Sequence, residues 1–150
     1  MKFFFLISFF CALVSCDNKK EKVHINITSS RNNEKCDPDF NLFFKKFASD
    51  SVFQKKHVKF PLKESYLDPE TTYETMKTEN INSKDYHYRK FPKENEASKF
   101  ENGAFSITVD KQKDTVFNKW RGIDNGIYVD FKFVFTDGCW YMVEIVDHSI

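Results

Sequence analysis

The residues of this chain best suited to chemistry are its cysteines, and Cys16 has the most informative surroundings. Cys16 directly follows Leu13-Val14-Ser15, which closes an apolar N-terminal run. Lys2 and the apolar residues 3–14 have the order of charge and hydrophobicity of a signal peptide. The run is shorter than the roughly 20 residues that a membrane-spanning helix needs. We therefore predict a lipoprotein signal peptide over residues 1–15 and lipidation of Cys16. The alternatives are an ordinary secretory signal cleaved near Ser15 and a buried core helix.

A thiol is needed at position 16 because its sulfur takes the diacylglyceryl group, and cleavage then frees the amino group for further acylation. Several acyl chains, at about 0.8 kcal/mol per buried methylene, make a firm anchor. The predicted partner is thus a lipid membrane, and the predicted location is the bacterial cell envelope, on the periplasmic face or the outer-membrane surface. Residues 16–35 are rich in Lys, Asn and Ser, which predicts a flexible polar tether. A single domain is expected over residues 36–150.

Charge and spacing argue against several classes of site. Removing residues 1–15 takes away one lysine and leaves as many basic residues as the 22 acidic ones, so no basic field favours nucleic acid. The histidines show no His-x-x-x-His spacing and the cysteines no Cys-x-x-Cys spacing, so we predict no metal site. No glycine-rich phosphate loop or G-x-S-x-G motif is present, and we expect no cofactor.

Cys36 and Cys139 remain as thiols of the mature chain if Cys16 is lipidated. A disulfide between them is possible in an oxidising compartment. It would close a loop of about 100 residues and add up to about 4.7 kcal/mol to the stability. Two free buried thiols are the alternative, because spacing alone does not show whether the two sites meet.

The first elements that must position these residues are helices. Asp37-Pro38 has the chemistry of a helix start, with Asp as the N-cap. An aromatic stripe at helical spacing follows and predicts a core-facing helix to residue 48 or 50; it comprises Phe40, Phe43, Phe44 and Phe47. Asp50-Ser51 predicts the cap of a second short helix. Residues 57–60 alternate as a strand that is expected to stop at Pro61-Leu62.

The middle of the chain carries weaker signals. Asp68-Pro69-Glu70 repeats the helix-start pattern and predicts a helix from Thr71 to about Lys77. Residues 86–90 alternate as an edge strand or an ordered loop, and the polar stretch from Pro92 predicts a loop.

From Gly103 onward the apolar residues alternate with a period of two. Runs at 105–109, 116–121, 127–135 and 140–147 are separated by turn signals, among them Asp124-Asn125-Gly126 and Asp137-Gly138. The pattern predicts a four-stranded antiparallel meander. Helices first and a sheet afterwards indicate an α+β fold.

The last hairpin has two possible registers, and they place Glu144 differently. A two-residue loop puts Glu144 opposite Phe131, among the phenylalanines, where burial would raise its pKa. A three-residue loop with a bulge puts Val143 there instead, and adds Tyr141, Val143 and Ile145 to the apolar face. We favour the second register because an unpaired buried carboxylate is costly.

The chain resembles an uncharacterised Bacteroidetes lipoprotein family, known as domain of unknown function 4348. The resemblance spans residues 36–148, except the middle (63–102), and rests on the phenylalanine stripe, Asp50-Ser51, Phe53-Gln54, the sequence 58–62 and Asp137-Gly138-x-Trp140. It implies a nuclear transport factor 2-like, cystatin-like fold, in which helices pack in the concave face of a curved antiparallel sheet to form a cone. It implies no catalytic residue.

Two functional hypotheses follow. The first is a non-enzymatic module that binds a small apolar ligand or an envelope protein in the mouth of the cone. Its expected lining is Trp120, Phe131, Phe133 and Tyr141, although the same rings could simply fill the core. The alternative is an isomerase or cyclase type of enzyme, which needs an acid/base group in the pocket. Asp130 and Glu144 are the candidate catalytic carboxylates.

Overall fold

The computed structural model describes residues 36–101 and 103–150, so the predicted signal peptide, tether and lipidation at Cys16 lie outside the described residues. The elements are α1 (Phe40–Ser49), α2 (Ser51–Lys56), β1 (Val58–Leu67), a 3-10 turn η1 (Pro69–Thr71), β2 (Met76–Ile81), α3 (Glu94–Ala97), β3 (Phe105–Gln112), β4 (Thr115–Gly122), β5 (Tyr128–Thr136) and β6 (Cys139–Asp147).

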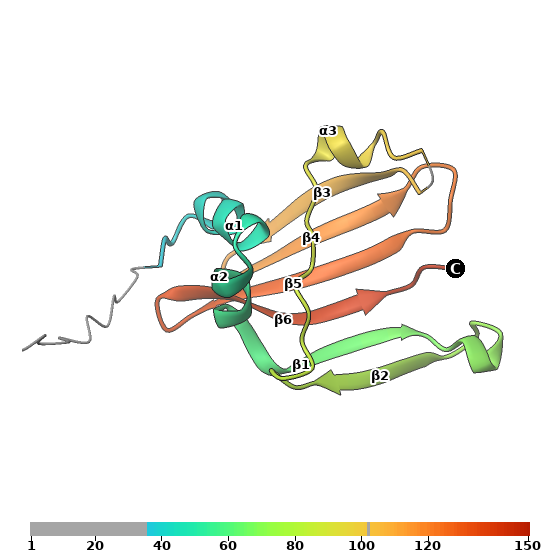
Figure 1. The fold of residues 1–150 in the computed structure, drawn as a ribbon, viewed down its shortest axis with the longest axis horizontal. Helices are drawn as coiled ribbons and strands as arrows, with labels where there is room; N and C mark the ends of the chain where they lie inside the picture. The colour runs from blue at the N-terminus through green and yellow to red at the C-terminus, as the bar shows by residue number, and fades with distance from the viewer. Residues whose placement is uncertain (1–35, 102) are drawn as a thin grey trace, which may run out of the picture. The chain divides into compact units, whose positions relative to one another are not determined.

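The strands form one six-stranded sheet in the order β2-β1-β6-β5-β4-β3. The late strands β3 to β6 pair antiparallel in sequence order, as the predicted meander requires. β1 pairs parallel with β6 and thereby joins the β1–β2 hairpin to the meander. The helices α1 and α2 lie over one face of this sheet (Figure 1), and the predicted α+β class is confirmed.

Aspartates cap both of the first two helices. The Asp39 carboxylate accepts hydrogen bonds from the amides of Asn41 (2.7 Å) and Leu42 (3.2 Å), so α1 begins at Phe40. The prediction of Asp37 as the cap is wrong by two residues, because its carboxylate reaches only the amide of Asp39. Asp50 caps α2 as predicted, and the hydrogen bond from the Phe53 amide is the main cause that lowers the pKa of Asp50.

The core lies between α1 and the central strands. Phe133 of β5 has no exposed surface, and its ring contacts four rings of α1 at centroid distances of 5.1 to 6.3 Å; these belong to Phe40, Phe43, Phe44 and Phe47. Edge-on contacts dominate, which is the arrangement that the aromatic quadrupole favours. The phenylalanine stripe is therefore core packing, and Phe133 does not line a pocket.

The middle of the chain departs from the sequence predictions. β1 continues through Pro61, after a cis peptide bond, to Leu67, because its pairing with β2 begins at Leu62 and its pairing with β6 resumes at Lys63. The predicted helix at 71–77 does not form, because its start at Pro69 gives only η1, which ends at Thr71, and residues 76–81 form β2. Pairing with β1 overrides the local helix signal, whose apolar face would have been only Tyr73 and Met76. The predicted loop after Pro92 contains the short helix α3.

The β5–β6 hairpin combines features of both registers considered above. The loop is the two-residue Asp137-Gly138, with φ angles of 54° and 77°, as a type I′ turn requires. A bulge between Lys132 and Phe133 then shifts the pairing, so that Phe131 lies opposite Ile145 rather than Val143 or Glu144. The favoured three-residue loop is thus wrong, but a bulge still keeps the carboxylate out of the core.

Candidate functional site

A groove opens on the helical side of the sheet, between α1, residues 91–96 and the outer strands β3 and β4. Its volume is about 610 Å³, and its apolar lining comprises Phe44, Ala48, Phe91, Pro92, Ile107, Val109 and Trp120. A second hollow of about 570 Å³ adjoins it and shares Ala48, Phe91 and Trp120. Such volumes suit a small organic ligand.

Seven of the fourteen residues that line the groove are polar or charged: Asn41, Lys45, Ser49, Lys93, Glu94, Glu96 and Asn118. Asn118 of β4 is 2% exposed, and its side-chain oxygen accepts a hydrogen bond from Trp120 Nε1 at 2.8 Å. That bond uses the one donor of the indole ring, so Trp120 presents an apolar surface to the groove. The rim carries both signs of charge, with Lys45 and Lys93 as well as Glu94 and Glu96.

The segment that closes one side of the groove is held by Gln54, which has no exposed surface. Its Nε2 donates to the carbonyls of Phe47 (3.1 Å) and Arg89 (2.9 Å). Its Oε1 accepts from the Tyr86 hydroxyl and the Arg89 amide, both at 2.8 Å. All four hydrogen-bonding positions of the amide are therefore satisfied.

Arg89 adds an ion pair to this arrangement. Its Nη2 lies 2.7 Å from both carboxylate oxygens of Glu64 in β1. Two residues farther along, the Phe91 ring packs against Phe131 at 4.8 Å and against Trp120 at 5.7 Å. The Gln54 and Arg89 contacts thus place Phe91 as a wall of the groove.

Only one of the four predicted lining residues borders the groove. Trp120 does, whereas Phe131 and Phe133 are 3% and 0% exposed and belong to the core. Tyr141 lies elsewhere, because its strand neighbours Trp140 and Met142 take the core positions. Lys59 Nζ lies 4.1 Å from the centre of the Tyr141 ring. The corrections have separate causes: α1 covers Phe133, the Phe91 and Trp120 rings cover Phe131, and strand alternation turns Tyr141 away from the core.

The two candidate catalytic carboxylates lie on the sheet face opposite the helices. Asp130 alternates with the buried Val129 and Phe131, and its Oδ1 is 2.6 Å from Arg121 Nη2. Glu144 pairs with Lys63 at 2.6 Å and faces Lys132 at 3.9 Å. The hypothesis that either of them serves in the groove is therefore wrong.

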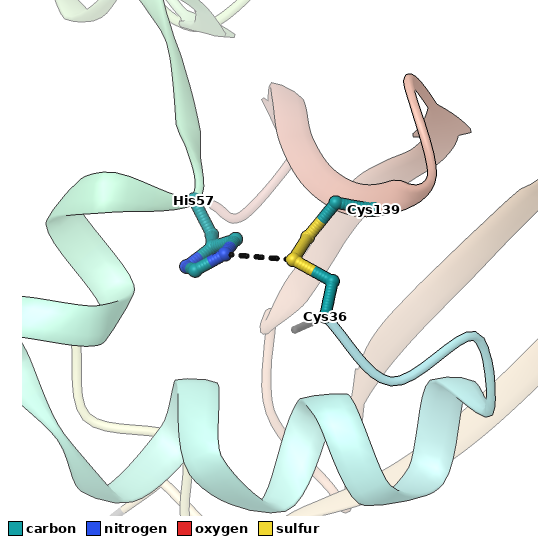
Figure 2. Close-up of side chains that lie close together, drawn as sticks. All are labelled: Cys36, His57 and Cys139. Carbon is teal, nitrogen blue, oxygen red and sulfur yellow. Dashed lines mark hydrogen bonds between the residues drawn. A yellow bond between two sulfur atoms is a disulfide. The ribbon is translucent and has the colours of Figure 1, made fainter. Parts of the chain in front are cut away.

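A group of three side chains, separate from the groove, joins the N-terminal end of the domain to β6. Cys36 and Cys139 form a disulfide, with Cα atoms 5.2 Å apart, so the bridged alternative left open by the sequence is the one found. Figure 2 shows the His57 ring directed at this bond, and its Nε2 lies 3.3 Å from Cys36 Sγ. Within 36–101 and 103–150 these are the only three residues grouped closely enough to hold a metal ion, and both sulfurs are bonded to each other.

His57 is 8% exposed and follows the last residue of α2. Its ring stacks on Phe53 at 3.9 Å, and its Nδ1 lies 2.8 Å from the Phe53 carbonyl oxygen. Burial lowers the pKa of His57, and the positive charges of Lys56 and Lys46 lower it further, against the opposing effect of that hydrogen bond. The ring is therefore neutral at pH 7.

Sequence reasoning used Gln54 only as part of the family resemblance and assigned it no structural role, because a glutamine in a short helix is usually at the surface. It placed His57 at the start of a strand and gave it no role in a site, since Cys36 and Cys139 are 21 and 82 positions away. No local pattern marks either residue, and the tertiary contacts alone reveal them.

None of the helices described at 36–101 or 103–150 is long and apolar enough to cross a membrane.

The chain has recognisable relatives. Residues 18–147 match the model of a family described as a domain of unknown function (DUF4348). No curated protein matches the chain significantly. An NTF2-like protein from Bacteroides fragilis is similar, with a TM-score of 0.52 and 20% identity over 75% of this chain and 47% of that one. The chain thus spans about half the length of that protein.

A cystatin-like protein from Bacteroides caccae is similar with a TM-score of 0.50 and 22% identity, over 71% of this chain and 74% of that one. A protein from Bacteroides uniformis gives the same four values. Likeness at this level of identity shows the fold alone. The architecture is therefore that of NTF2-like proteins, as the resemblance implied.

Proposed function

The chain belongs to the DUF4348 family, and from this premise we propose that it is a lipid-anchored protein of the bacterial cell envelope whose groove binds a small apolar ligand without chemical conversion. The observation that carries the binding proposal is the groove itself, about 610 Å³ in volume, with partly exposed apolar walls. Apolar concavities of this size with a few polar groups are the usual form of ligand sites.

Exposure supports the groove as a working surface. Val109 is 44% exposed in β3, although it lies on the same face of the strand as Ile107, along the groove wall. Phe100, beside the adjoining hollow, is also 44% exposed. A ligand that covered these side chains would remove apolar area from water at about 25 cal/mol per Å².

Intrinsic fluorescence tests the ligand proposal, because the chain has two tryptophans and only Trp120 borders the groove. In the Trp140→Phe variant, titration with naphthalene should change the Trp120 emission and saturate. Adding Val109→Asp should weaken this binding about tenfold, equivalent to about 1.4 kcal/mol. Leu42→Asp is the matched control, because Leu42 is 59% exposed on α1 and does not line the groove. Equal affinities in both variants, or no saturable change, would refute the proposal.

The anchoring proposal rests on the sequence around Cys16 and has a separate test. Cells that express Cys16→Ser should incorporate no labelled fatty acid into the protein, and the protein should be unprocessed or released. Retention of label or of membrane association in the variant would overturn lipidation at Cys16 while leaving the groove proposal untouched.

The isomerase or cyclase alternative requires an acid/base group that reaches the groove. Asp130 and Glu144 do not, because both are paired with cations on the opposite face of the sheet. The carboxylates at the groove are Glu94 and Glu96 on α3, and both are exposed at its rim. No observation favours this alternative over ligand binding.

A further inference from the structure

The tautomer of His57 follows from its contacts. The Phe53 carbonyl oxygen can only accept a hydrogen bond, so Nδ1, 2.8 Å away, carries the proton of the neutral ring. The other nitrogen, Nε2, then presents its lone pair to Cys36 Sγ at 3.3 Å. A disulfide sulfur has no hydrogen to donate, so in the oxidised protein this base faces a sulfur that cannot complete a hydrogen bond with it.

The same geometry is productive when Cys36 carries a thiol. A cysteine beside a histidine, whose other nitrogen is held by a third group, is the arrangement that activates a nucleophile. Here the Phe53 carbonyl holds the ring, and the Phe53 and Phe43 rings fix its plane at centroid distances of 3.9 and 5.5 Å. The Cys36 S–H would donate to Nε2 and could transfer its proton there.

We propose that Cys36, Cys139 and His57 form a thiol–disulfide exchange site, in which His57 activates Cys36 and Cys139 closes the bond again. The substrates would be dithiols in one direction and disulfides in the other. Accessibility assigns the roles, because Cys36 is partly exposed whereas Cys139 is 3% exposed. This site is independent of the groove and of the proposed anchor.

The exchange transfers two electrons between an external dithiol and the Cys36–Cys139 disulfide. A thiolate of an external dithiol attacks Cys36 Sγ, the Cys36–Cys139 bond breaks, and Cys139 leaves as a thiolate that takes up a proton. The second thiol of the dithiol gives its proton to His57 Nε2 and attacks the dithiol sulfur of the mixed disulfide. Cys36 is released as a thiolate and takes that proton from Nε2. The dithiol is oxidised to a disulfide, and the protein is reduced by two electrons. The reverse steps oxidise the protein.

The test measures alkylation of the two thiols in the full chain after reduction and removal of the reductant. Iodoacetamide reacts for short times between pH 5 and 9, and mass spectrometry reports the modification of Cys36 and Cys139 separately. Circular dichroism and tryptophan fluorescence follow the fold of the reduced protein. His57→Phe keeps an aromatic ring on Phe53 but removes the base. His148→Phe is the matched control, because the His148 ring packs on Tyr128 at 5.3 Å.

The expected difference in alkylation rate between Cys36 and Cys139 follows from thiol chemistry. If the histidine lowers the pKa of the Cys36 thiol from about 8.5 to about 6.5, the ionised fraction at pH 6 rises roughly 80-fold. The less basic thiolate is also a weaker nucleophile, which lowers the rate about tenfold. Cys36 should therefore react about tenfold faster than Cys139 at pH 6. His57→Phe should abolish this excess and move the Cys36 profile to higher pH. Lys46 and Lys56, which also face His57, contribute positive charge that is unchanged in the variant.

Three outcomes would overturn the proposal. Equal reactivity of Cys36 in the wild type and in His57→Phe would make His57 a packing residue. Loss of the fold on reduction, with both thiols equally reactive, would make the disulfide purely structural. Ordinary reactivity in the metal-free reduced protein, combined with tight protection of both thiols by Zn²⁺, would make the cluster a Cys₂His metal site.

Discussion

Replacing Gln54 by methionine is the sharpest test of how the groove wall is held. Methionine has a similar length and no hydrogen-bonding amide, so it fills the space but abandons four partners. Two of these bonds, to the Phe47 carbonyl and from the Tyr86 hydroxyl, are buried, and the two to Arg89 are partly buried. At about 1 kcal/mol for each bond lost, the variant should be less stable by about 4 kcal/mol.

The assay is urea unfolding of the oxidised chain, followed by tryptophan fluorescence at constant pH. Tyr86→Phe is the graded control, because it removes one of the four bonds and leaves Gln54 Oε1 with the Arg89 amide as a donor. Its expected cost is about 1 kcal/mol. The Arg89 amide should also lose hydrogen-exchange protection in Gln54→Met but not in Tyr86→Phe.

The reasoning would be refuted if Gln54→Met cost no more than Tyr86→Phe. That result would mean that water replaces the lost partners and that the segment from Tyr86 to Phe91 is held by other contacts. A large loss of stability with unchanged protection at Arg89 would separate the two roles. Gln54 would then stabilise α1 and α2 without holding the wall of the groove.

Phe133→Ala should lower the free energy of unfolding by about 4 kcal/mol in the same urea assay, because a fully buried ring is removed; a loss under about 1 kcal/mol would contradict its central place. Gly138→Ala should cost about 1 kcal/mol, since its φ is 77° and no atom lies within 4 Å of the added Cβ, so a larger loss would point to a clash instead. Cys36→Ser combined with Cys139→Ser should cost about 4 kcal/mol by freeing the unfolded chain, and an unchanged urea midpoint would exclude this. Because the pKa of His57 is lowered on folding, stability should be complete above about pH 6.5 and should fall as the pH drops below it, and His57→Phe should flatten that slope.

Local sequence was enough to predict the elements whose pattern is strong. The phenylalanines of α1 repeat at helical spacing, and the residues of β3 to β6 alternate between the two faces, so both periods were readable without a structure. The caps and the Asp137-Gly138 turn were also legible because their chemistry is local, although Asp39 and not Asp37 caps α1. Residues 1–35 keep their sequence-based predictions of signal, lipid attachment and tether.

Other features depend on contacts between distant residues. β2 forms where a helix was expected because β1 offers it a hydrogen-bonding edge, and the bulge between Lys132 and Phe133 sets which residues of β6 face the core. The groove exists because α1 covers the inner strands and leaves β3 and β4 open. The same logic holds for the two sites of greatest interest. Gln54 and His57 carry no local signal, and only the folded chain brings Arg89 to the first and the Cys36–Cys139 bond to the second.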